Sequence, residues 1–60
     1  DEEIGPESPA ATFRRLRLEM LEAERKEFIA QRDAGAIDDE VLRNLLRGLD
    51  LEEAALNRDS

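Results

Sequence analysis

The chain of 60 residues contains no cysteine, no histidine, no tryptophan and no tyrosine. Disulfides, thiol chemistry and zinc sites built from Cys and His are therefore excluded. Enzymes usually gather a nucleophile, a base and an orienting group in one pocket. Here the hydroxyl side chains are Ser8, Thr12 and Ser60, which lie in or near the termini. These residue types predict that the chain is not an enzyme and holds no cofactor.

Aromatic side chains and positive charge are also scarce. The two aromatic residues, Phe13 and Phe28, are too few to form a stacking platform for bases. The net charge is −7, from 16 acidic and 9 basic residues. Such a surface repels nucleic acid and anionic lipid, so we expect no nucleic-acid partner.

Long hydrophobic runs are missing as well. No apolar run approaches the roughly 20 residues that span a bilayer. The first residues, Asp1-Glu2-Glu3, have the wrong charge for a signal peptide. The chain opens without Met in what looks like a linker, so we expect it to be a piece of a longer protein.

The acidic cluster of Asp33, Asp38, Asp39 and Glu40 does not match a calcium loop. Such a loop needs oxygen ligands at alternate positions. Counting from Asp33, the third and fifth positions are Gly35 and Ile37. The sequence therefore predicts no metal site, and these carboxylates are interpreted as helix caps and as partners of a helix dipole.

What the chain does contain is typical of amphipathic helices, because 42% of its residues are charged and 40% are apolar. Its centre, Arg32–Val41, combines a helix stop with a helix start. Gly35 can adopt the left-handed conformation that ends a helix. Asp38 or Asp39 can cap the next helix. The chain is therefore predicted to be a helical hairpin.

The first helix is predicted over residues 10–34, with Ser8 as its N-cap and Pro9 at its first position. Its apolar residues form a wide band rather than a narrow stripe. Phe13, Leu16, Met20 and Ala23 form one line, Leu21 and Phe28 flank it, and Leu18 and Ile29 lie further round. One neighbouring helix would not cover this band, so we expect a second neighbour from another chain.

The second helix is predicted to begin near Asp39, and its apolar residues follow helical spacing. These residues are Val41, Leu42, Leu45, Leu46 and Leu49. Gly48 weakens a helix, and Asp50 followed by Glu53 has the spacing of a capping box. The alternatives are one continuous helix to about Asn57 or a third short helix from Asp50. The adjoining stop and start signals favour a break or kink near Gly48.

The predicted fold class is therefore all-α, a helical hairpin over residues 10–57 that is completed by homodimerisation. Residues 1–9 are predicted to be a flexible linker and residues 58–60 a frayed end. The spacing also predicts ion pairs four residues apart, Arg15–Glu19, Glu22–Lys26 and Asp39–Arg43. The residues expected in the core or interface are Phe13, Leu16, Met20, Leu21, Phe28, Leu42, Leu45, Leu46 and Leu49. Those expected in turns and caps are Gly35, Asp38, Asp39 and Asp50.

Three segments of the chain resemble the cytoplasmic C-terminal tail of bacterial sodium/proton antiporters of the monovalent cation:proton antiporter family. They are Ala23-Glu24-Arg25, then Asp33-Ala34-Gly35-Ala36-Ile37-Asp38-Asp39-Glu40-Val41, then Leu49-Asp50-Leu51-Glu52-Glu53-Ala54. In that family a tail helix leads to a turn of glycine and acids, and a second helix follows. The resemblance covers roughly residues 16–56, and Gly48 departs from it because a longer helix-forming residue is expected there.

The resemblance implies a parent membrane protein that exchanges Na⁺ or another monovalent cation for H⁺. Its transport residues would lie in a membrane domain outside this sequence. The expected role of the chain is then regulation or dimerisation at the cytoplasmic side of the plasma membrane, with a second copy or the parent's membrane domain as partner. The alternative is an unrelated helical-hairpin adaptor that binds an amphipathic partner helix.

Overall fold

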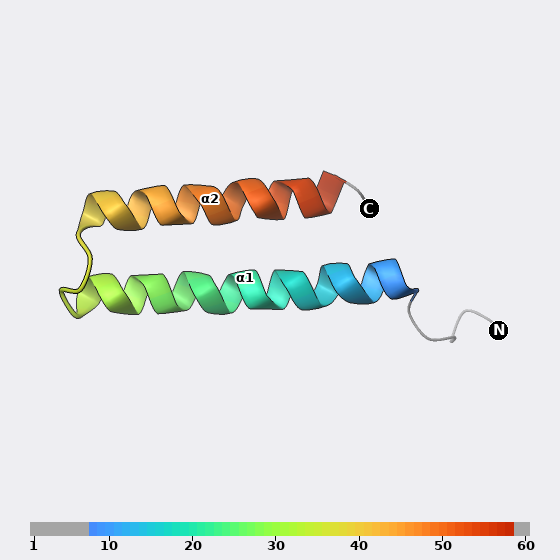
Figure 1. The fold of residues 1–60 in the computed structure, drawn as a ribbon, viewed down its shortest axis with the longest axis horizontal. Helices are drawn as coiled ribbons and strands as arrows, with labels where there is room; N and C mark the ends of the chain where they lie inside the picture. Colours follow the sequence, from blue (N-terminus) through green and yellow to red (C-terminus); the bar gives the residue numbers. More distant parts are fainter. Residues whose placement is uncertain (1–7, 59–60) are drawn as a thin grey trace.

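The computed structural model describes residues 8–58, and its two helices run antiparallel. Helix α1 spans Pro9–Asp33 and helix α2 spans Asp39–Arg58. They lie side by side with the turn at one end and the start of α1 and the end of α2 at the other (Figure 1). The predicted all-α helical hairpin is therefore confirmed.

The predicted boundaries of the hairpin are close to the observed ones. Ser8 and Pro9, which were assigned both to the linker and to a helix start, form the start of α1, and Arg58 is the last residue of α2 rather than part of a frayed end. The rest of the predicted linker, residues 1–7, and of the predicted frayed end, residues 59–60, lies outside the described residues.

The N-terminus of α1 forms as its sequence predicts. Ser8 has extended backbone angles, and its Oγ accepts a hydrogen bond from the backbone N–H of Ala11 at 3.1 Å. Pro9 follows in the first turn, where a backbone N–H has no helical partner to lose. The serine and the proline together define where α1 begins.

The turn ends α1 with a left-handed glycine, as predicted. Gly35 has φ of +82°, and its N–H donates to the Arg32 carbonyl at 3.0 Å. The N–H of Ala36 donates to the Gln31 carbonyl at 2.9 Å. These two bonds satisfy carbonyls that the end of α1 would otherwise leave open, in the pattern of a Schellman motif.

Helix α2 is capped by Asp38, one of the two candidates. Its Oδ1 accepts a hydrogen bond from the backbone N–H of Val41 at 2.8 Å. Asp39 and Glu40 follow in the first turn, where their charge suits the positive end of the helix dipole. Asp39 is therefore the first residue of the helix rather than its cap.

The predicted break near Gly48 is wrong, because α2 is continuous from Asp39 to Arg58. A glycine inside a helix costs only about 1 kcal/mol relative to alanine. Leu42 and Leu49, on either side of Gly48, are both buried against α1, and helical continuity is what places them on one face. Burial of each leucine is worth about 1.5–3 kcal/mol, which outweighs the cost of the glycine. Asp50 accordingly lies inside α2 and caps nothing.

The fully buried part of the hairpin is small. The buried hydrophobic side chains are Leu21, which is 1% exposed, and Leu42 and Leu49, which are 7% exposed. Across its long axis the molecule measures only 20 by 12 Å. Two helices in a single layer leave each helix with most of its circumference unpaired, so the fold has little core and much surface.

Candidate interaction surface

The side of α2 that faces α1 is lined by leucines. Leu42 and Leu49 are buried, and Leu45, Leu46 and Leu56 are half-buried around them. Their spacing of three and four residues keeps them on one face of the helix. The leucines predicted for the core on α2 therefore form the contact between the helices, which we call the seam.

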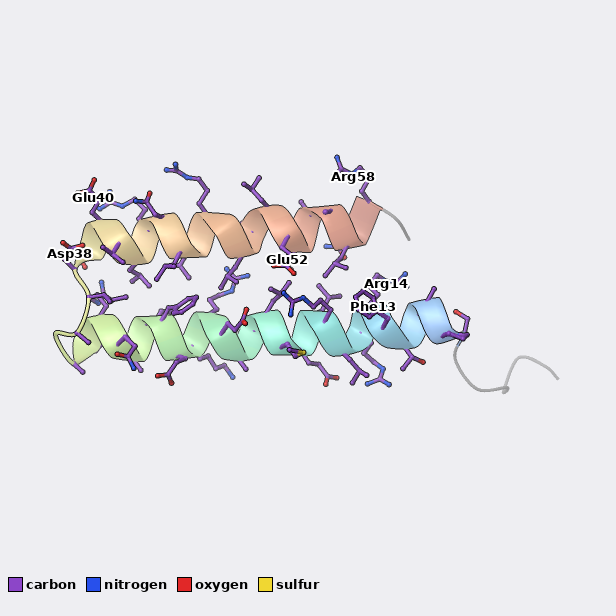
Figure 2. The ribbon with its side chains drawn as sticks, viewed as in Figure 1. Phe13, Arg14, Asp38, Glu40, Glu52 and Arg58 are labelled. Atoms are coloured by element: carbon purple, nitrogen blue, oxygen red, sulfur yellow. The ribbon has the colours of Figure 1, made fainter. Side chains whose placement is uncertain are left out.

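The side of α1 that faces α2 is different in character. Leu21 is buried and Phe28 is half-buried, but three arginines also reach across the seam from α1 to acids on α2. Arg17 Nε donates to Glu52 Oε2 at 2.6 Å, and Figure 2 shows Glu52 on the side of α2 turned toward α1. The contact is thus made of leucines on one helix and of apolar side chains with arginines on the other.

Arg25 holds the middle of the seam with two acids. Its Nη1 donates to Asp50 Oδ1 at 2.8 Å and its Nη2 to Glu53 Oε1 at 2.9 Å. Glu22 on the same helix lies 3.8 Å from its Nε. The hydrogen bond to Asp50 raises the pKa of the Arg25 guanidinium above its ordinary value, with partial opposition from desolvation and further support from the three carboxylate charges.

Arg32 forms ion pairs with acids at the end of the hairpin that contains the turn. Its Nη1 donates to Asp39 Oδ1 at 2.8 Å and its Nε to Asp33 Oδ1 at 2.9 Å. The hydrogen bond to Asp39, followed by that to Asp33, raises the pKa of Arg32. A raised guanidinium pKa means that the charge is lost only above the ordinary value, so both arginines stay charged over the usual pH range.

These ion pairs across the seam were missed by the sequence analysis, which considered only partners four residues apart. Arg15–Glu19 forms as predicted, with 3.4 Å between Nη1 and Oε2. The other two predicted pairs are wrong: Glu22 pairs with Arg25 instead of Lys26, and Asp39 pairs with Arg32 instead of Arg43. The missed signal is that Arg17, Arg25 and Arg32 recur at two-turn spacing on the side of α1 that carries Leu21.

The line of apolar residues that the sequence analysis emphasised on α1 lies largely outside the seam, although Phe13 at its start is turned toward the end of α2. Phe13 is 62% exposed, Met20 is 53% exposed and Leu16 is 47% exposed, and Ala23 and Ala30 continue the line as exposed residues. Figure 2 places Phe13 near the open end of the hairpin, where it borders a shallow hollow shared with Leu56. We call the five residues Phe13, Leu16, Met20, Ala23 and Ala30 the outer face.

The nine residues predicted for the core or interface therefore separate into two groups. Six of them line the seam, namely Leu21, Phe28, Leu42, Leu45, Leu46 and Leu49. Three of them, Phe13, Leu16 and Met20, lie on the outer face. The turn and cap residues are placed as predicted for Gly35, Asp38 and, as first residue of α2, Asp39, whereas Asp50 bonds Arg25.

Within residues 8–58 no charged or polar side chain is buried, and no group of three acidic residues is gathered for a metal ion. Neither α1 nor α2 is long and apolar enough to cross a membrane.

No protein-family model, curated protein or solved structure matches the chain. The outer face is the part of α1 where large apolar side chains stay exposed.

Proposed function

We propose that the chain is a non-catalytic assembly module, the cytoplasmic regulatory and dimerisation tail of a sodium/proton antiporter. The observation that carries the assembly role is the outer face, where three large apolar side chains are about half exposed or more. Apolar side chains in line on one helix are typical of a surface that another helix covers. Exposed apolar side chains that gather on one face mark protein contacts in many soluble proteins.

The antiporter context rests on the three segments that resemble the tails of that family. In the hairpin these segments depend on one another. Arg25, in the first segment, bonds Asp50 and Glu53, which lie in the third. The second segment contains Gly35 and Asp38, which end α1 and cap α2. Segments that fold as one unit are expected to occur together, which supports reading them as one resemblance rather than three.

In this proposal the chain contributes no transport residue. The membrane domain of the parent protein exchanges the cation for a proton, and the hairpin brings two tails together or docks on that domain. Contacts between tails would then bias how the two transport units move relative to each other. A module that adjusts a transporter in this way needs an accessible contact surface and a stable turn.

The experiment that tests the proposal uses the parent protein in membrane vesicles. The parent gene should encode about a dozen hydrophobic spans before the hairpin. Replacing Leu16 and Met20 together with glutamate in the full-length protein should leave cation-dependent proton exchange measurable but change its pH dependence or the fraction of cross-linked dimer. Ile29→Glu, at an exposed position off the outer face, is the matched control.

Two results would contradict the proposal. A parent protein without hydrophobic spans would exclude the antiporter context and favour the helical-hairpin adaptor instead. Full-length protein in which the double variant and Ile29→Glu behave like the unaltered protein in exchange and cross-linking would exclude an assembly role for the outer face.

A further inference from the structure

We propose that the partner of the outer face is a second copy of this chain, with the two α1 helices packed antiparallel. This inference deepens the proposed assembly role and rests on it. It concerns which residues meet across the dimer and why the antiparallel orientation is selected over the parallel one.

The outer face has the spacing of a helix-pairing seam. Phe13, Leu16, Met20, Ala23 and Ala30 follow one another in steps of three and four residues, with Glu27 filling the remaining position. Alternating steps of three and four residues are what two helices require to keep contact along their length. The exposure of all six positions shows that α2 covers none of them substantially.

The distribution of side-chain size along this line favours antiparallel packing. The large residues Phe13, Leu16 and Met20 lie in the first half of α1, and the small residues Ala23 and Ala30 lie in the second half. Antiparallel packing sets Phe13 against Ala30 of the second copy, Met20 against Ala23 and Leu16 against Glu27, so two of the three kinds of layer join a large side chain to a small one. A surface that complements itself in this way is what a two-fold dimer needs.

The charges beside the line select the same orientation. Arg17 and Glu24 flank one side of the outer face, and Glu19 and Lys26 flank the other. In antiparallel helices each flank faces the same flank of the second copy, so Lys26 meets Glu19, whereas Arg17 is already bonded to Glu52 across the seam. The Lys26–Glu19 pair occurs twice because of the two-fold symmetry, which gives two ion pairs between the chains.

Parallel packing would bring like charges together. Glu27 would face Glu27 of the second copy, and Glu19 would approach Glu24 across the seam. Phe13 would also meet Phe13 while Ala30 met Ala30, which leaves space at one end and crowding at the other. Both the charges and the sizes therefore disfavour the parallel dimer.

Two of the charged residues have no other assignment in the hairpin. Within residues 8–58, neither Glu24 nor Lys26 takes part in an ion pair. Arg17 is held by Glu52 on α2. The second copy supplies Glu19 as an opposite charge for Lys26 without disturbing the pairs that close the hairpin.

A second copy is favoured over an unrelated helix by the order of sizes and charges along α1. An amphipathic helix of another protein would not be expected to repeat the sizes and charges of α1 in reverse order.

The first test measures the mass of the 60-residue chain in solution by light scattering over a range of concentrations, with helicity followed by circular dichroism. The expected result is a species of twice 6.8 kDa that dissociates on dilution. Glu19→Lys should weaken the dimer roughly tenfold, since it breaks two ion pairs and creates repulsion with Lys26. Combining it with Lys26→Glu should restore the dimer. In a parallel dimer Glu19→Lys would instead strengthen association, which would overturn the proposal.

The second test uses the absence of native cysteine, so that each introduced thiol is the single thiol of its chain. A mixture of Phe13→Cys and Ala30→Cys chains should form disulfide-linked pairs between the two variants. Phe13→Cys alone should not cross-link, because antiparallel packing separates the two sites by about 25 Å. Self-linking of Phe13→Cys would show a parallel dimer and overturn the proposal.

The failure of this inference can be told apart from failure of the proposed function. A monomer at all concentrations would overturn the second copy as partner. If that monomer still binds the parent's membrane domain, and the binding is lost on replacing Leu16 and Met20 with glutamate, the assembly role stands. A dimer that Ile29→Glu disrupts and Met20→Glu does not would overturn the outer face as its contact.

Discussion

Leu16 and Leu21 are both leucines on α1, yet Leu21 has 1% of its surface exposed and Leu16 has 47% exposed. Leu21 lies in the seam against α2, and Leu16 lies on the outer face. Helix α1 is therefore apolar on two sides, and its partner within the chain covers one of them. The wide apolar band of α1 is therefore divided into a side that α2 covers and a side that α2 leaves exposed.

Truncating each of these two leucines to alanine should give the largest difference in the free energy of unfolding. Leu21→Ala should lower the free energy of unfolding by about 2–5 kcal/mol, because it removes buried methyl groups from a core with few members. Leu16→Ala should change it by less than about 0.5 kcal/mol in the monomer, where the side chain is already solvated. Urea unfolding followed by circular dichroism, at a concentration where both variants are monomeric, measures the two values.

The control for this pair is Leu51→Ala on α2, since Leu51 is 67% exposed and should resemble Leu16 rather than Leu21. Equal losses for Leu16 and Leu21 in the monomer would mean that the outer face packs against the chain itself. That result would contradict the division of α1 into a seam side and an outward side.

Gly48 tests, with a smaller expected effect, whether the side of α2 away from α1 is also free of contacts within the chain. A side-chain carbon added at Gly48 would have nothing within 4 Å to contact. Gly48→Ala should therefore stabilise the hairpin by up to about 1 kcal/mol through helix propensity alone. The midpoint of urea unfolding should rise. A fall would show that the exposed side of α2 is occupied, and Gly35→Ala is the opposite control because Gly35 has φ of +82°.

The sequence was sufficient for the hairpin, the turn and both caps, because these depend on local signals such as Ser8, Gly35 and Asp38. It was also sufficient to find the leucine side of α2. It was misleading at Gly48, since a local stop signal gave way to leucines that pack on both sides of it. Tertiary packing decided that position, and no local pattern contains that information.

The seam side of α1 was harder to predict for a different reason. Hydrophobic periodicity points to Phe13, Leu16 and Met20 because they form the clearest apolar line on that helix. The true seam also uses the stems and charged ends of Arg17, Arg25 and Arg32, which periodicity counts as polar. Long arginine side chains can cover an apolar contact while their charge reaches an acid at its edge. A search for acids on α2 that match these arginines in spacing would have identified the seam.

The ion pair of Arg17 and Glu52 gives the smallest predicted effect and the finest test of that explanation. Arg17→Gln and Glu52→Gln should each lower the free energy of unfolding by about 0.2–1 kcal/mol, since the pair is partly exposed to solvent. The double variant should lose less than the sum of the two single variants, because each removes the same interaction. Additive losses would mean that the two side chains act separately. The arginine would then stabilise the seam through its stem, and replacing it with methionine should restore what glutamine had lost.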